Sequence, residues 1–243
     1  SDWFNSSYYH ALYQHRDYTE ALQFIDNLLT YLKPLPHATM LDIACGKGRH
    51  SKALFDAGFD VTGIDLSSAS IEAASNMKTN GLHFFCHDMR ETFKANHFDY
   101  AFNFFTSFGY FDTHEEHQLA ISAMAANLKE NGTLVIDYLN VGLIEETNGD
   151  DVMIQMEHLI FHTKKWQDDL YLFKEIKVVD AVSHEVLGVF EERVRKYNLN
   201  DFVIFMQKAG LQIIATFGDY QLNAYEASSS NRLILVAQKH SIS

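Results

Sequence analysis

The chain has 243 residues, and its content of 47% hydrophobic and 14% aromatic residues fits one buried core of α/β type and excludes a disordered chain. A formal net charge of −13 argues against nucleic acid as a partner, because phosphate binding needs a clustered basic surface. The chain has few cysteines and no recognisable signal peptide, which predicts a cytoplasmic protein. Its apolar stretches are well short of the roughly 18 residues of a membrane span, so we expect no binding to membranes.

A helix is predicted ahead of the first strand. Residues 17–20 match a capping box, and apolar residues then recur at helical spacing over residues 22–32. Lys33 and Pro34 end this pattern. We expect residues 1–36 to form a helical cover of the main domain.

Strands and helices then alternate along the chain. The expected strands lie near residues 39–44, 60–65, 82–86, 98–105 and 133–139, and the expected helices near 48–57, 68–79 and 114–129. Such alternation implies right-handed βαβ units and a parallel sheet covered on both faces. A helix at 200–209 precedes strands at 211–217 and 232–238, which should pair antiparallel because no helix separates them. The predicted fold is therefore α/β, with a doubly wound, mostly parallel sheet of seven strands.

Residues 152–198 break this pattern. Apolar and polar residues alternate there, and turn signals at 167–169 and 182–184 divide the segment into three strands. We predict a small antiparallel meander inserted into the main domain, which comprises residues 1–151 and 199–243.

The most informative motif is the turn between the first strand and the helix after it. Residues 41–51 run from an apolar stretch through Asp42, Gly46 and Gly48 into a helical pattern. The missing Cβ atoms let a ligand approach the backbone, and the helix start offers free N–H groups. Asp65 follows Gly46 by 19 positions, about the 20 at which an acid reaches ribose hydroxyls. The motif predicts a nucleoside-binding site. For Asp42 the alternative is a purely structural role, in which it only holds the backbone of the turn.

A dinucleotide is disfavoured as the ligand of this turn. Its fingerprint needs Gly or Ala at position 51, where the chain has Ser51, and it rarely has an acid such as Asp42 in the first strand. The order and spacing of five segments instead resemble the class I S-adenosylmethionine-dependent methyltransferases. These segments are residues 41–51, 63–67, 86–89, 98–104 and 128–136.

The resemblance implies a Rossmann-like methyltransferase fold and a function. The protein is expected to bind S-adenosyl-L-methionine and to transfer its methyl group to a small-molecule acceptor by in-line displacement. Two alternatives stay open, a nicotinamide-dependent oxidoreductase and a non-catalytic protein that binds S-adenosylmethionine. In related enzymes an insertion such as 152–198 is a substrate lid or a dimer contact, so we expect a monomer or a homodimer.

Parts of the cofactor can be assigned to individual residues. Asp65 should accept hydrogen bonds from the ribose hydroxyls, with a solvated strand-end acid as the alternative. Asp88 should accept from the adenine amino group, with an Asx turn or a helix cap as the alternative. Leu66 and Met89 would sandwich the adenine, and backbone groups at 44–48 would bind the methionine carboxylate. The cofactor-binding residues expected from these motifs are Ala44, Cys45, Gly46, Gly48, Asp65, Leu66, Asp88, Met89, Asn103 and Phe104.

The aromatic N-terminal segment could close over the cofactor. Tyr9 and Tyr13 would offer ring faces to the sulfonium cation, and Arg16 would bind the carboxylate. The alternative is an amphipathic helix that packs on the sheet, and this is favoured for Trp3 and Phe4.

The acceptor is expected at the carboxyl ends of the parallel strands, where α/β sites occur. Its pocket could be lined by Tyr110, Tyr138, Tyr220 and Asn223, although aromatic loop residues often only pack. No catalytic residue is assigned, because a sulfonium methyl is already electrophilic and a base is optional. The acceptor atom (N, O, S or C) is not distinguished.

No metal site is expected. His114 and His117 stand at i and i+3, whereas the zinc protease motif needs i and i+4. Residues 113–116 match a capping box, so both histidines are predicted in a solvated first helical turn.

Overall fold

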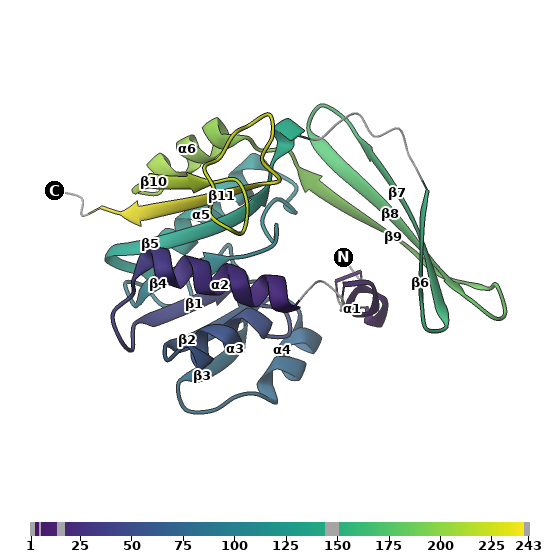
Figure 1. Ribbon diagram of the computed structural model, residues 1–243, viewed down its shortest axis with the longest axis horizontal. Coiled ribbons are helices and arrows are strands. Elements are labelled where there is room, and N and C mark those ends of the chain that lie inside the picture. The colour runs from purple at the N-terminus through teal and green to yellow at the C-terminus, as the bar shows by residue number, and fades with distance from the viewer. Residues whose placement is uncertain (1–2, 5, 14–17, 144–150, 241–243) are drawn as a thin grey trace. The chain divides into compact units, whose positions relative to one another are not determined.

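The computed structural model describes residues 3–4, 6–13, 18–143 and 151–240, which form two compact units (Figure 1). The larger unit comprises Asp17–Leu143 and Tyr197–Ser243, and the smaller unit comprises Ser1–Arg16 and Ile144–Lys196. The N-terminal segment, expected within the 1–36 cover, therefore divides between the two units.

A seven-stranded sheet forms the centre of the larger unit, in the order β10-β11-β5-β4-β1-β2-β3. Neighbouring strands are parallel except β11, which is antiparallel to both β5 and β10. The strands are β1 (Thr39–Ile43), β2 (Asp60–Asp65), β3 (Leu82–Cys86), β4 (Phe98–Asn103), β5 (Leu128–Leu139), β10 (Leu211–Phe217) and β11 (Arg232–Lys239). The predicted α/β fold with a doubly wound, mostly parallel sheet is confirmed.

Helices cover both faces of this sheet (Figure 1). They are α2 (Tyr18–Leu32), α3 (Arg49–Asp56), α4 (Ser68–Ser75), α5 (His114–Asn127) and α6 (Leu199–Lys208), with a short 3-10 turn η1 (Val141–Leu143). Helices α2, α3 and α4 share a core with Val135 of β5, whereas Tyr138 of β5 packs against Phe202 of α6. Val135 and Tyr138 point to opposite faces because side chains alternate along a strand. None of the helices in the described part of the chain is long and apolar enough to cross a membrane.

The predicted capping box at the start of α5 is confirmed. The Glu116 N–H donates to Oγ1 of Thr113 at 3.1 Å, and the Thr113 N–H donates to Oε2 of Glu116 at 3.0 Å. His114 is exposed as expected, but the prediction for His117 was wrong. That ring is buried against Phe108, because it lies on the inward side of the helix.

Two strand boundaries differ from the prediction by more than one residue. Strand β4 ends at Asn103 because Phe105 and Thr106 have φ values of 55° and 56°, in the left-handed region. Each costs on the order of 1–3 kcal/mol for a residue other than glycine. Strand β5 begins five positions early, because Leu128 already has extended backbone and pairs with Phe98.

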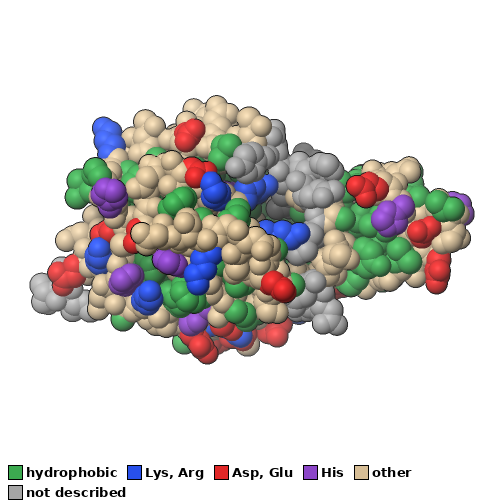
Figure 2. Space-filling model, turned by 90° about the horizontal axis from the view of Figure 1, so that it is seen from below, with side chains coloured by type: hydrophobic (Ala, Val, Ile, Leu, Met, Phe, Trp, Pro, Cys, Tyr) green, Lys and Arg blue, Asp and Glu red, His purple; other side chains and the backbone are tan. Residues whose placement is uncertain are grey.

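The smaller unit is an antiparallel sheet in the order β6-β7-β8-β9. Its strands are β6 (Val152–Met156), β7 (Leu159–Gln167), β8 (Tyr171–Asp180) and β9 (Val186–Arg195). The antiparallel prediction is confirmed, but the number of three strands was wrong because β6 has no alternation of apolar and polar residues. Hydrophobic side chains gather on the surface of this unit (Figure 2). Among the exposed apolar residues of the unit are Val152, Met153 and Val189, which are 51%, 64% and 58% exposed.

Helix α1 (Ser7–Tyr13) packs on one face of this smaller sheet. Trp3 and Leu12 are buried against Phe161, Ile176 and Val178 in one apolar cluster. Hydrogen bonds add to the packing. Glu192 of β9 accepts one at 2.7 Å from the Trp3 indole and another at 2.7 Å from the Tyr13 hydroxyl.

Candidate functional site

The glycine turn joins β1 to α3 and has three residues in the left-handed region. Ala44, Gly46 and Gly48 have φ values of 59°, 55° and 78°. The Cys45 N–H donates to the carbonyl of Ile64 at 3.0 Å, and the Gly48 N–H donates to the carbonyl of Cys45 at 3.0 Å. The first bond ties the turn to β2, whose carboxyl end carries the predicted ribose acid, and the second lies within the turn.

The two glycines have different surroundings. A Cβ atom on Gly48 would lie 2.5 Å from Cε1 of Phe84, so close packing in the fold requires glycine there. A Cβ atom on Gly46 would meet no atom of the described residues within 4 Å. Gly46 therefore faces open space that a ligand can occupy.

Asp65 connects the turn to the end of β2. Its Oδ2 accepts a hydrogen bond from the Gly46 N–H at 2.8 Å, and its Oδ1 accepts one from the Ser67 N–H at 2.8 Å. Burial raises the pKa of Asp65 above its ordinary value, and these two N–H groups act in the opposite direction. A carboxylate has about four lone-pair positions, so two bonds leave it able to accept from ribose hydroxyls.

Asp42 lies buried behind the turn. Its Oδ2 accepts a hydrogen bond from the Ser51 hydroxyl at 2.6 Å, which joins β1 to the first turn of α3. Burial raises the pKa of Asp42 to about 7, with the Ser51 hydrogen bond opposing this shift. Ser51 thus has a structural role at the position where a dinucleotide fingerprint has glycine or alanine.

The segment after β3 holds the predicted adenine residues. Asp88 forms an Asx turn by accepting from the Arg90 N–H at 2.9 Å, and it pairs with the Arg90 guanidinium at 2.6 Å. That hydrogen-bonded pair lowers the pKa of Asp88. Leu66 is 68% exposed and Met89 is half-buried, so apolar surface is present near the ends of β2 and β3.

Two buried polar atoms, one on Asn103 at the end of β4 and one on His50 of α3, have no hydrogen-bond partner among the described residues. Asn103 donates from Nδ2 to the carbonyl of Ile43 at 3.0 Å, but its buried Oδ1 has no hydrogen-bond partner among the described residues. The His50 ring packs between Phe104 and Phe105, at 4.9 Å from each ring centre, and its Nε2 is likewise without a partner in the described chain. Burial lowers the pKa of His50 to about 3, so this imidazole is neutral.

A buried charged network lies at the carboxyl ends of β4 and β5 and at the start of β11. Asp137 has no exposed surface, and its carboxylate accepts from the Phe105 N–H at 2.9 Å, the Tyr220 hydroxyl at 3.0 Å and Nε of Arg232 at 2.8 Å. Arg232 also donates from Nη2 to Oγ1 of Thr106 at 2.8 Å. The network joins three strands and the β10–β11 loop.

Sequence reasoning found Tyr220 but missed Asp137 and Arg232. A signal was available, because Asp137 is an acid inside the apolar stretch of β5. A buried carboxylate needs a charged or hydrogen-bonded partner, so its presence there predicts a second polar residue in contact with it. The identity of that partner depends on the register of β11 against β5, which the sequence alone does not contain.

A family model described as a methyltransferase domain matches residues 40–132. The chain is 25% identical to the putative methyltransferase YqeM of Bacillus subtilis (strain 168), over 96% of this chain and 95% of that protein. It is 27% identical to a glycine/sarcosine N-methyltransferase of Aphanothece halophytica, over 82% of this chain and 76% of that protein. These matches support the predicted resemblance to the class I S-adenosylmethionine-dependent methyltransferases.

Solved structures have the same fold as this methyltransferase. An S-adenosylmethionine-dependent methyltransferase from Clostridium acetobutylicum ATCC 824 matches with a TM-score of 0.80 at 18% identity, covering 96% of each chain. S-adenosylmethionine-bound CalS10, an amino pentose methyltransferase from Micromonospora echinaspora, matches with a TM-score of 0.74 at 21% identity, covering 96% of this chain and 97% of that chain. The predicted family, methyl-transfer activity and S-adenosyl-L-methionine cofactor are confirmed, and neither alternative function gains support.

The residues of the methyltransferase fit this cofactor. Three features occur at the carboxyl ends of the parallel strands. They are the open space at Gly46, the spare acceptor capacity of Asp65, and the Oδ1 of Asn103, which has no partner among the described residues. Exposed Leu66 adds apolar surface for an adenine ring. The individual contacts of these residues with the cofactor stay predictions.

The four predicted acceptor residues lie in different settings. Tyr220 belongs to the Asp137 network, and Tyr110 is half-buried. Tyr138 is fully buried against Phe108 and Phe202, which matches the alternative of an aromatic residue that only packs. Asn223 donates from Nδ2 to Asp219 at 2.8 Å within the β10–β11 loop.

The N-terminal cofactor residues belong to the smaller unit. Tyr9 packs edge-on against Trp3 and Tyr13, and Tyr13 bonds to Glu192 and Lys174. This packing matches the alternative of an amphipathic helix, but the helix packs on the inserted sheet and not on the parallel sheet. Arg16 lies outside the described residues. A contact of Tyr9 or Tyr13 with the cofactor stays a prediction.

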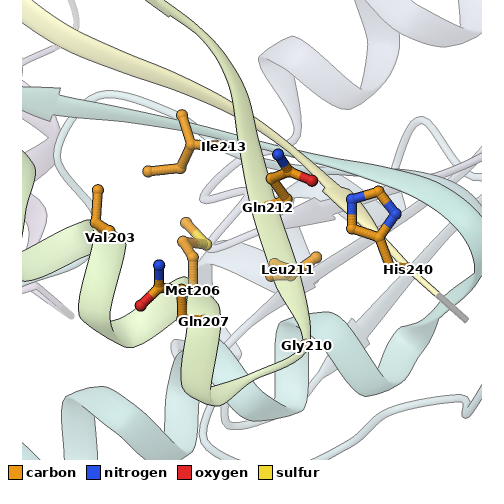
Figure 3. Close-up of a pocket in the computed structure, with 8 residues that line it drawn as sticks. All are labelled: Val203, Met206, Gln207, Gly210, Leu211, Gln212, Ile213 and His240. Carbon is orange, nitrogen blue, oxygen red and sulfur yellow. The ribbon is translucent and has the colours of Figure 1, made fainter. Parts of the chain in front are cut away.

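A groove between α6 and β10 is separate from this site (Figure 3). Leu211 of the groove pairs with Lys239, and the neighbouring Gln238 pairs with Thr133 near the start of the parallel part of β5. The groove therefore lies at the amino ends of the parallel strands, opposite the glycine turn. Within the described residues, no three His, Cys, Asp or Glu side chains are grouped to hold a metal ion.

Proposed function

We propose that this methyltransferase transfers a methyl group to an amine nitrogen of a small molecule. The observation that carries the proposal is the placement of two sets of residues at one edge of the sheet. The glycine turn, Asp65 and Asp88 follow β1, β2 and β3, and the Asp137–Arg232–Tyr220 network follows β4 and β5. Ligands of open α/β sheets bind at this edge.

The cofactor residues have complementary roles. When bound, S-adenosyl-L-methionine supplies an electrophilic sulfonium methyl. Asp65 accepts hydrogen bonds from the ribose hydroxyls, and Asp88 with Leu66 and Met89 holds the adenine. The backbone of the glycine turn binds the methionine carboxylate, and Asn103 Oδ1 accepts from its ammonium.

The charges around the candidate site favour a cationic cofactor and a neutral amine. His50 is uncharged because its pKa is about 3, so it adds no positive charge beside a sulfonium. Arg232 is compensated by Asp137 at 2.8 Å. The role proposed for the chain is to align the unprotonated amine with the S–CH3 bond and to exclude water.

The relatives support an amine acceptor. One relative is a glycine/sarcosine N-methyltransferase, and one similar structure is an amino pentose methyltransferase. The net charge of −13 is also consistent with a small or basic acceptor rather than a nucleic acid.

Matched acceptors test this proposal. The full-length protein would be incubated with methyl-labelled S-adenosylmethionine and glycine, sarcosine or an amino pentose. Glycolate and the corresponding pentose, which carry a hydroxyl in place of the amine, serve as controls. We expect label in at least one amine and none in its hydroxyl counterpart. Label in the hydroxyl compounds alone, or in no amine, contradicts the proposal.

A further inference from the structure

The turn after β4 is strained and yet well anchored. Phe105 and Thr106 are consecutive residues other than glycine in the left-handed region, and Thr106 is β-branched. A strained pair of this kind persists only where the surrounding structure over-determines it, and such pairs concentrate at functional sites. The source of the restraint is therefore informative about function.

Asp137 restrains both residues of this turn. Its carboxylate accepts from the Phe105 N–H at 2.9 Å, and its backbone carbonyl accepts from the Thr106 N–H at 2.9 Å. Arg232, which Asp137 binds through Nε, donates from Nη2 to the Thr106 hydroxyl at 2.8 Å. One buried carboxylate thus fixes the turn directly and through its guanidinium partner.

Phe105 of this turn contacts both a residue next to the glycine turn and a predicted acceptor residue. The Phe105 ring stacks on His50 of α3, the helix that follows the glycine turn, at 4.9 Å and 25°. The Phe105 ring also lies 5.3 Å from the ring of Tyr220, whose hydroxyl donates to Asp137. A change in the turn would displace both His50 and Tyr220.

We propose that Asp137 is a positioning residue for methyl transfer, which holds the Phe105–Thr106 turn and Tyr220 so that the acceptor side of the site keeps its geometry. This rests on the proposed function, because the acceptor is placed beyond β4 and β5. Asp137 is not a catalytic residue, since its carboxylate is occupied by protein donors. A merely structural carboxylate would affect stability without affecting the turnover of folded protein.

The first variant is Asp137→Asn in the full-length protein. An amide offers one acceptor oxygen in place of two and brings an NH2 group against existing donors. With S-adenosylhomocysteine bound, we expect amide hydrogen exchange of Phe105 and Thr106 to accelerate at least tenfold, measured by NMR. We also expect kcat for the amine acceptor to fall at least tenfold, with KM for S-adenosylmethionine changed less than threefold.

Asp99 provides a matched control at the opposite edge of the sheet. It accepts from the Thr39 N–H and hydroxyl, each at 2.8 Å, and from Lys129 at 2.9 Å. Asp99→Asn therefore removes a similar set of bonds at the amino end of β1. We expect it to lower thermal stability and to leave kcat and the exchange of Phe105 unchanged.

A rescue variant separates positioning from general destabilisation. Asparagine adopts the left-handed region more readily than threonine, and its amide oxygen can accept from Arg232. The double variant Thr106→Asn, Asp137→Asn should have a kcat at least threefold higher than Asp137→Asn alone. Its amide exchange at the turn should be at least threefold slower than in Asp137→Asn. Unchanged kcat and exchange in folded Asp137→Asn would overturn the proposal, and so would a loss equal to that of Asp99→Asn.

Two further arms keep the test decisive. If Asp137→Asn does not fold, Tyr220→Phe and Arg232→Lys are measured in its place, with the same expected losses and the same overturning result. If the wild-type protein methylates no amine, the proposed function fails. The exchange arm is independent of the acceptor, so it still upholds or overturns the role of Asp137 in the turn.

Discussion

Gly46 and Gly48 stand two positions apart in one motif, but the structure gives them separate roles. Gly46→Val places a side chain in the open space of the turn, so we expect a folded protein whose affinity for S-adenosylhomocysteine falls more than tenfold. Gly48→Ala brings a Cβ within 2.5 Å of Phe84, so we expect a loss of thermal stability. Calorimetry and thermal melts on the same preparations check both.

Gly58 supplies the control for backbone strain. It has a φ of 99° and no described atom within 4 Å of an added Cβ, but it lies ahead of β2, at the other edge of the sheet. Gly58→Val should destabilise the protein to a similar extent as Gly46→Val and leave S-adenosylhomocysteine affinity unchanged. Equal affinity losses in both variants would show that strain, rather than the ligand's space, explains the effect.

Asp42 predicts a pH dependence of stability. Burial raises its pKa from an ordinary value of 3.8 to about 7, so the folded state holds the proton more tightly than the unfolded state. The free energy of unfolding contributed by Asp42 is therefore greatest below pH 4 and decreases as pH rises toward 7, by about 1.4 kcal/mol per unit within that window. Asp42→Asn removes this titration.

Urea melts at pH 5, 6 and 7 measure the effect. The free energy of unfolding of the wild-type protein should decrease more steeply with pH than that of Asp42→Asn, because all other titrating groups are shared. Ser51→Ala removes a hydrogen bond that lowers the pKa of Asp42, so it should extend the decrease in the free energy of unfolding to higher pH. Parallel pH profiles for wild type and Asp42→Asn would contradict the assignment.

At the scale of elements, the sequence predicted what local patterns determine. The strands of the parallel sheet and the helices between them follow from alternating periodicities, and the start of α5 follows from the Thr113–Glu116 capping box. The glycine turn and the acid at the end of β2 were also readable, because both depend on residue types at a fixed spacing.

Features that depend on tertiary contacts were not predicted. Strand β6 has no alternation to reveal it and is defined by its pairing with β7. The end of β4 was placed two residues late because the left-handed turn depends on bonds from Asp137. The burial of His117 depends on how α5 faces Phe108. In each case the deciding partner is distant in sequence.

At the scale of the whole molecule, the smaller unit combines two distant segments of the chain and has its own apolar cluster. Helix α1 and the inserted sheet share one apolar cluster, although they are more than 130 residues apart in the chain. The unit also exposes apolar side chains on β6 and β9, among them Met153 and Val189. Exposed apolar surface of this kind marks interaction sites, which favours a role in binding the acceptor or a second copy.

Removal of the smaller unit tests that role. Residues 1–16 and 151–196 should be removed together, with a Gly/Ser linker for the second segment, because loss of the sheet alone would expose Trp3 and Leu12 of its core. The glycine turn, Asp65 and Asp88 all lie in the larger unit. We therefore expect S-adenosylhomocysteine affinity to fall about tenfold at most, which allows for ring contacts of Tyr9 and Tyr13 worth about 1 kcal/mol.

The same variant should lose methyl transfer to the amine acceptor completely, because we predict that the smaller unit serves the acceptor rather than the cofactor. Calorimetry and turnover on one preparation give both results. Retained turnover would refute a role for the smaller unit in acceptor binding. An affinity loss above a hundredfold would instead place essential cofactor contacts on the N-terminal segment, because the larger unit keeps every other residue assigned to the cofactor.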